Sequence, residues 1–96
     1  MTMTNSEISK YILESIIRLA QGRVGEVTED TLLIGDGSVL DSMNLVELCL
    51  SLEDLSDELG FSFDWTSEVA MSRSRSMFRT AGSLITEFVR QKGGGQ

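Results

Sequence analysis

Asp41 and Ser42 are the residues whose types and spacing could do chemistry, because they stand where a glycine-containing stretch meets an expected helix. A serine hydroxyl can carry a phosphate ester. A phosphate at this place would lie beside the unpaired N–H groups and the positive end of the helix. Asp41 could help to hold Mg²⁺ while such a phosphate is delivered. Aspartate and serine are also favoured N-cap residues, and the isolated pair fits a purely structural cap better than a site.

Enzymatic chemistry has few residues to use in this chain. There is no histidine, which removes the commonest general base and the Ser–His and Cys–His pairs. The single cysteine, Cys49, excludes an internal disulfide. It falls on the expected core side of its helix, where a thiol is a small buried apolar residue and not a nucleophile. We therefore expect a protein that is not an enzyme.

The helix that must position Ser42 is expected over residues 42–59, and it is apolar on two opposite faces. A surface helix needs only one apolar stripe to pack on its core. An apolar centre with an acidic rim is typical of a transient docking surface, and the alternative is a helix covered on both sides. The first face carries Leu45, Leu48, Cys49, Leu52, Leu55 and Leu59, the second carries Met43, Val46 and Leu50, and the acids beside the second are Glu47, Glu53, Asp54, Asp57 and Glu58.

The remaining elements predict an all-α fold, a small four-helix bundle of three main helices and one short helix. The main helices are expected over residues 6–21, 42–59 and about 81–91, with N-caps at Ser6 and Thr80 and an end at Gly60. A short helix is expected over 65–71, after an extended connector with Phe63 turned inward, and a basic turn over 72–78. A long loop over 22–41 is expected to be held to the core by Leu32, Leu33 and Ile34.

The length and the charge of the chain indicate a small, acidic, single-domain protein. The 96 residues form a single domain over 1–96, ordered over about 6–91, with a frayed glycine-rich tail. The net charge is −7, and residues 26–68 hold 12 of the 15 acids and none of the 8 bases. Such a surface attracts basic partners and repels nucleic acid. With no apolar stretch long enough to span a bilayer and no visible signal peptide, we expect a cytoplasmic monomer that does not insert into membranes.

The run from Gly35 to Leu48 contains Asp41-Ser42-Met43 and Val46-Glu47-Leu48. It closely resembles the phosphopantetheine attachment segment of acyl carrier proteins, which reads Asp-Ser-Leu at the start of the second helix and then Val-Glu-Leu. Helix order, the long loop before the second helix and the final helix agree over about residues 6–90. The resemblance implies that the chain is a member of the acyl carrier protein family.

The resemblance also assigns roles. Ser42 would carry 4′-phosphopantetheine through a phosphodiester, and the thiol of that arm would hold acyl intermediates of fatty acid, lipid or polyketide-type biosynthesis as thioesters. Asp41 would assist the phosphopantetheinyl transferase that attaches the arm. The partners would be acyl-transferring and acyl-modifying enzymes with basic docking patches, and they would meet Glu47, Glu53 and Asp54 around an apolar centre of Met43, Val46 and Leu50.

Some residues depart from the family pattern. Met43 replaces the usual leucine, Leu55 stands where the family often has an acid, and Arg73, Arg75 and Arg79 make the third segment basic. These features indicate a specialised member. We also expect the second and last helices to part around an acyl chain, because Cys49, Met71, Met77 and Ala81 are small or flexible core residues.

Three alternatives stay open. The chain could be an aminoacyl or peptidyl carrier, or an acidic helical adaptor that is never modified. It could also bind calcium through Asp36, Ser38 and Glu47, but Leu40 cannot ligate through its side chain and Asp41 replaces the glycine that such a loop needs.

Overall fold

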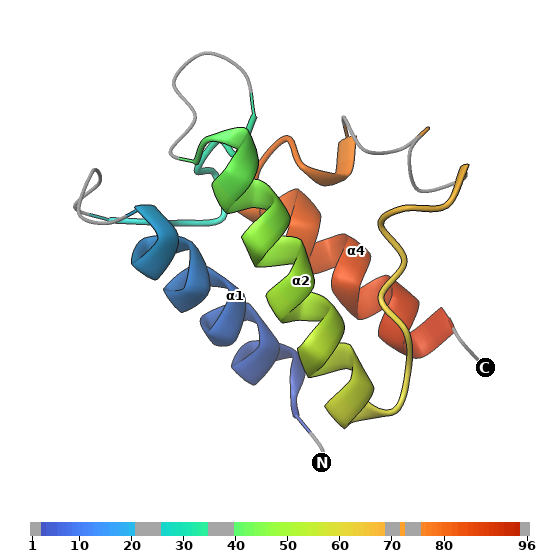
Figure 1. The fold of residues 1–96 in the computed structure, drawn as a ribbon. Coiled ribbons are helices and arrows are strands. Elements are labelled where there is room, and N and C mark those ends of the chain that lie inside the picture. The colour runs from blue at the N-terminus through green and yellow to red at the C-terminus, as the bar shows by residue number, and fades with distance from the viewer. Residues whose placement is uncertain (1–2, 21–25, 35–39, 69–71, 73–75, 95–96) are drawn as a thin grey trace.

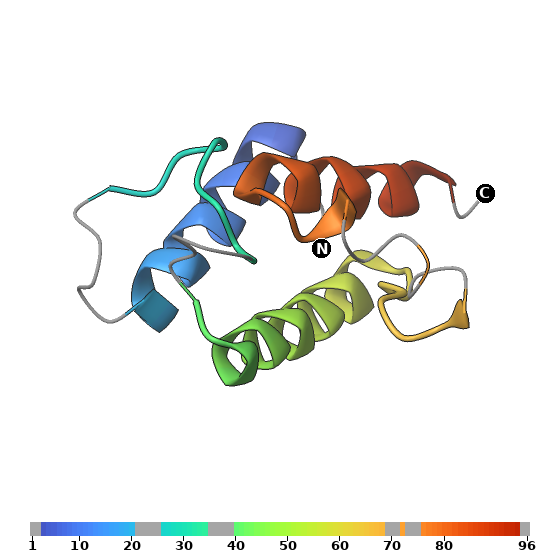
Figure 2. The same ribbon diagram turned by 90° about the horizontal axis from the view of Figure 1, so that it is seen from above.

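The computed structural model describes residues 3–20, 26–34, 40–68, 72 and 76–94 of the chain. Its named elements are three helices, α1 (Asn5–Ala20), α2 (Ser42–Leu59) and α4 (Ala81–Gly94). The three helices lie side by side, and α2 runs opposite to α1 (Figure 1). Seen from above, α2 lies on one side of the pair that α1 and α4 form (Figure 2). Among the described residues the β pairing is limited to an isolated bridge between Leu32 and Thr80. The predicted all-helical class is therefore confirmed.

Helix α1 begins at a capping box and not at the predicted Ser6. The Thr4 hydroxyl accepts a hydrogen bond from the Glu7 N–H at 3.1 Å, and the Glu7 carboxylate accepts one from the Thr4 N–H at 2.9 Å. These bonds to Thr4 lower the pKa of Glu7. Ser6 lies inside the first turn. The helix is capped at Thr4 because the glutamate three residues later can accept a hydrogen bond from the Thr4 N–H. Ser6 has no glutamate or glutamine at that spacing.

Helix α2 has the predicted bounds, Ser42 to Leu59. The Asp41 carboxylate caps its start by accepting a 2.8 Å hydrogen bond from the Asn44 N–H. Gly60 ends it in the left-handed region at φ 92°, where glycine has no Cβ to clash. The Phe61 N–H then donates to the Ser56 carbonyl at 3.0 Å, which closes the helix end.

The start of α4 is fastened to the segment between the first two helices. Thr80 caps it as predicted, because its hydroxyl accepts a 3.1 Å hydrogen bond from the Ser83 N–H. The next two helical N–H groups, those of Ala81 and Gly82, donate to the carbonyls of Thr31 and Glu29 at 2.9 and 2.8 Å. At its other end α4 continues to Gly94, beyond the predicted end at Gln91. An established helix can extend through poor helix formers because its costly nucleation step is already complete.

The core lies between the three helices. Phe88 packs against Phe63 and Phe61 with ring centroids 5.2 Å apart in both pairs, and Phe63 is buried as predicted. Leu33 anchors the segment before α2 with 1% exposure, and Ile34 is half-buried. Leu32 is 39% exposed, so its predicted anchoring role is wrong. The fully buried residues from the helices include Ile8, Ile12 and Ile16 of α1, Leu48 and Leu52 of α2, and Leu84 of α4.

Two predicted features are not confirmed. In the stretch expected to form a short helix over 65–71, residues 65–67 are bends, residue 68 is helical, and residues 69–71 lie outside the described residues. Two segments of the expected loop over 22–41, residues 22–25 and 35–39, also fall outside them. Arg73 and Arg75 of the predicted basic turn lie there as well, whereas Arg79 is described and exposed.

Replacing Gly82 with alanine tests the contact between α4 and the preceding segment. A Cβ at Gly82 would stand 3.0 Å from both the carbonyl oxygen and the Cβ of Glu29. We expect Gly82→Ala to lower the free energy of unfolding by about 1–3 kcal/mol, because backbone must shift to admit the methyl group. Gly93→Ala is the matched control, since nothing lies within 4 Å of its Cβ. Urea unfolding followed by circular dichroism measures both. A Gly82→Ala protein as stable as the parent would contradict the contact.

Candidate functional site

Ser42 is the first residue of α2, and both Ser42 and Asp41 are exposed. The first N–H groups of a helix have no carbonyl partner within it. Asp41 satisfies one of them, that of Asn44, and its own backbone carbonyl accepts from the Leu45 N–H at 3.0 Å. The Ser42 hydroxyl therefore stands in solvent at the positive end of α2, where an attached phosphate group would be stabilised.

Asn44 is a positioning residue that the sequence did not reveal. Its side-chain amide donates a 2.6 Å hydrogen bond to the Leu19 carbonyl. Leu19 lies in the last turn of α1, where carbonyls lack partners within the helix. The bond ties the start of α2 to the end of α1 and so fixes the place of Ser42. A polar residue beside the core face was the only available signal, and it does not identify the partner.

The second apolar stripe of α2 is exposed. Met43 is 73%, Leu50 49% and Val46 44% exposed, and we call these three residues the α2 ridge. The opposite face supplies the buried residues Leu48, Cys49, Leu52 and Leu55. The alternative in which other helices cover both faces of α2 is therefore wrong. Three exposed apolar side chains on one helix face, next to Ser42, form a surface that water solvates poorly.

The acids beside the ridge are not equivalent. Glu47 and Asp54 are exposed, as are Asp57 and Glu58. Glu53 is half-buried, and its carboxylate accepts a hydrogen bond from the indole N–H of Trp65. Glu47 and Asp54 are thus directly available to a basic partner, whereas Glu53 already has a donor.

Comparison with protein-family models, with curated proteins and with solved structures finds no match to this chain. The function proposed for it therefore depends on the residues around Ser42 and on the surface of α2. The described residues contain no helix long and apolar enough to cross a membrane.

Neither the calcium hypothesis nor the predicted shelter for an acyl chain is supported by a site among the described residues. No group of three or more histidine, cysteine or acidic side chains that could hold a metal occurs among the described residues, and two of the predicted calcium ligands, Asp36 and Ser38, lie outside them. Cys49, Met77 and Ala81 are buried as expected of an acyl shelter, whereas Met71 is not described. The parting of α2 and α4 around an acyl chain stays a prediction.

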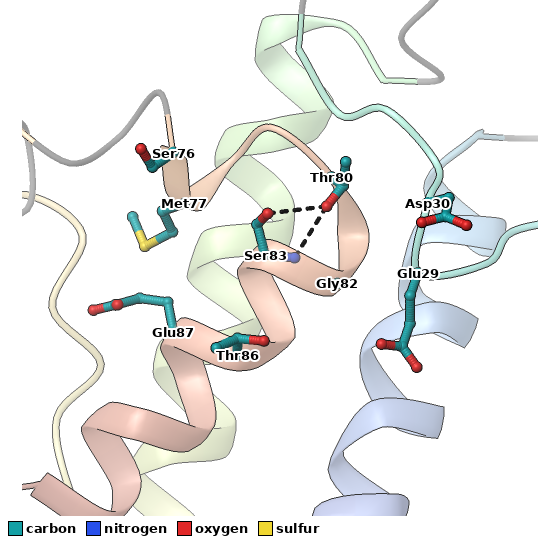
Figure 3. Close-up of a pocket in the computed structure, with 9 residues that line it drawn as sticks. All are labelled: Glu29, Asp30, Ser76, Met77, Thr80, Gly82, Ser83, Thr86 and Glu87. Carbon is teal, nitrogen blue, oxygen red and sulfur yellow. Dashed lines mark hydrogen bonds between the residues drawn. The ribbon is translucent and has the colours of Figure 1, made fainter.

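A groove of about 470 Å³ lies elsewhere, across the first half of α4 (Figure 3). Glu29 and Asp30 stand on one side of it and Ser76 and Met77 on the other, and no residue of α2 lines it. Its Thr80 and Ser83 hydroxyls are hydrogen-bonded to each other at 3.0 Å. The groove is therefore separate from Ser42 and from the α2 ridge.

Cys49 has the properties of a structural residue. It is 1% exposed, and burial raises the pKa of its thiol to about 12, with the charge of Glu53 adding to the shift. At neutral pH the thiol is protonated, and the thiolate is the reactive form. This environment agrees with the expected role of Cys49 as a buried apolar residue and disfavours a thiol nucleophile at this position.

Alkylation of Cys49 tests this environment. We expect iodoacetamide to modify the native protein on the order of a thousandfold more slowly than the urea-unfolded chain, because burial suppresses the thiolate. The unfolded thiol ionises near pH 9, so native stability should fall as the pH rises from about 9 towards 12. Intact-mass measurement over time follows the reaction. Native labelling as fast as that of the unfolded chain would show a reactive thiol instead.

Proposed function

We propose that this chain is an acyl carrier protein, folded as a small four-helix bundle, that bears 4′-phosphopantetheine on Ser42. The observation that supports this best is the exposed Ser42 hydroxyl at the first residue of α2, directly beside the exposed α2 ridge. The resemblance of the run Gly35–Leu48 to the family's attachment segment supports it independently.

The residues around Ser42 fit such a group. Ser42 is exposed, and the positive end of α2 favours the phosphodiester. Asp41 caps α2 with one carboxylate oxygen, and its exposed carboxyl group leaves the other for a metal ion used by the transferase. The arm would supply a thiol that holds acyl groups as thioesters. The residues of the chain fix the position of Ser42 and leave it accessible to enzymes.

The ridge and its acids support the second part of the proposal, the partners. Met43, Val46 and Leu50 would fill an apolar patch on a phosphopantetheinyl transferase or an acyl-processing enzyme of fatty acid, lipid or polyketide-type biosynthesis. Glu47 and Asp54 would meet arginines and lysines around that patch. Charges on such a rim govern encounter rate and orientation more than final affinity.

An unmodified adaptor is the second candidate function, because the exposure of the ridge does not depend on any group on Ser42. Such an adaptor would use the same surface and the same acids. Modification of Ser42 separates it from a carrier. An aminoacyl or peptidyl carrier would be modified in the same way, and it differs from an acyl carrier only in the cargo on the arm.

Loading with coenzyme A tests the attachment point. We expect several broad-specificity phosphopantetheinyl transferases to add one phosphopantetheine mass to the full chain, and Ser42→Ala to abolish the addition because the acceptor hydroxyl is gone. Ser51→Ala, at a half-buried serine of the same helix, is the control and should load normally. Intact mass spectrometry reads the result. Loading of the Ser42→Ala chain would refute the assignment, and no loading of the parent would favour the adaptor.

Neutralising acids of α2 tests the docking surface. We expect Glu47→Gln and Asp54→Asn each to raise the transferase's KM for the chain about two- to fivefold, with kcat little changed, because rim charges steer encounter. The effect should shrink as salt is raised. Glu14→Gln changes an exposed acid of α1 by the same charge and should have no effect. Equal KM values for all four proteins would place docking elsewhere.

A further inference from the structure

The connector that follows α2, residues 61–65, is held by hydrogen bonds on two sides. The Trp65 indole N–H donates to Glu53 of α2. On the other side, the Gln91 side chain of α4 accepts a 2.6 Å hydrogen bond from the Asp64 N–H and donates a 2.9 Å hydrogen bond to the Asp64 carbonyl. The connector runs from the end of α2 up along α4 (Figure 1). Residues 64 and 65 therefore link α2 to α4 through three side-chain hydrogen bonds.

Glu53 lies at the border between this link and the α2 ridge. Each residue of a helix turns by about 100°, which places Glu53 about 20° from Val46 and about 60° from Leu50 around the axis. Beside it, a niche of about 240 Å³ is lined by Glu53, Ser56, Asp57, Ser62 and Phe63. Of the residues that the structure describes, those lining the niche include two carboxylates and no base. A cationic side chain reaching over the ridge would enter it next to Glu53.

We infer that Trp65 and the basic partner compete for Glu53, so that docking on the α2 ridge detaches the indole and loosens the connector from α2. This rests on the proposed function, in which the ridge receives partners with arginines or lysines. The indole N–H is a neutral donor, whereas a guanidinium forms charge-assisted and often bidentate hydrogen bonds with a carboxylate. The stronger donor displaces the weaker one. Because Gln91 still holds Asp64, the released connector stays attached to α4.

The competition predicts opposite effects for two substitutions. Trp65→Phe keeps an aromatic ring on the core but removes the donor, which frees Glu53 and should tighten partner binding about three- to tenfold. Glu53→Gln keeps an acceptor for the indole but removes the charge, and it should weaken binding by a similar factor. Glu14→Gln is the matched control, because Glu14 is an exposed acid of a different helix, α1, and the substitution removes the same charge.

The experiment uses the full ¹⁵N-labelled chain and an unlabelled, helical amphipathic peptide of leucines and arginines as the basic probe. Trp65 is the only tryptophan, so the spectrum has one indole N–H signal. We expect this signal to shift with the same saturation curve as the amides of the ridge, and the three variants to order as Trp65→Phe, Glu14→Gln and Glu53→Gln from tightest to weakest.

Three results would overturn the inference. They are an indole signal that stays in place while ridge amides shift, a Trp65→Phe chain that binds like the parent, and a probe that does not bind the ridge at all. If Trp65→Phe does not fold, the indole signal of the parent and of Glu53→Gln still decides. Loading of Ser42 is measured without the probe, so failure of the competition and failure of the carrier proposal are read from separate experiments.

Discussion

The anchored start of α2 is the constraint on which the rest of the structure depends. The Asp41 carboxylate accepts from the Asn44 N–H, and the Asn44 side chain in turn donates to the Leu19 carbonyl at the end of α1. One short polar cluster thus decides where α2 begins and how it sits on α1. It leaves the Ser42 hydroxyl facing solvent at a defined place beside the ridge.

Helix α2 has one apolar face in the core and a second apolar face exposed to solvent. Its buried face supplies Leu48 and Leu52 to the core. That core is small, because a chain of about 100 residues buries only about 60–65% of the surface that its unfolded form exposes. Yet Met43, Val46 and Leu50 stay outside that core. Leaving apolar side chains in water gives up burial energy that so small a domain could use, on the order of 1–3 kcal/mol for each. The binding role that we propose for the ridge would account for this arrangement.

Periodicity and capping chemistry made most of α2 predictable, from its bounds to the burial of Leu48 and the exposure of Met43. These features are local and follow from helical geometry. Contacts between elements were not predictable. Asn44 could have bonded to several helix ends, and nothing in the sequence pairs Trp65 with Glu53 or Gly82 with Glu29. The start of α1 differs from the prediction, because Thr4 and Glu7 carry the capping-box spacing whereas the predicted cap was Ser6.

In the proposed carrier, the attachment point, the ridge and the connector all lie on or beside α2. The proposal requires that Ser42 bears a covalent arm in the cell and does more than begin a helix. The most direct test is the intact mass of the chain purified from the cells in which it is naturally made, followed by fragmentation to locate any added mass. We expect one phosphopantetheine group on Ser42, bare or with an acyl cargo. A chain of unmodified mass under every growth condition would contradict it.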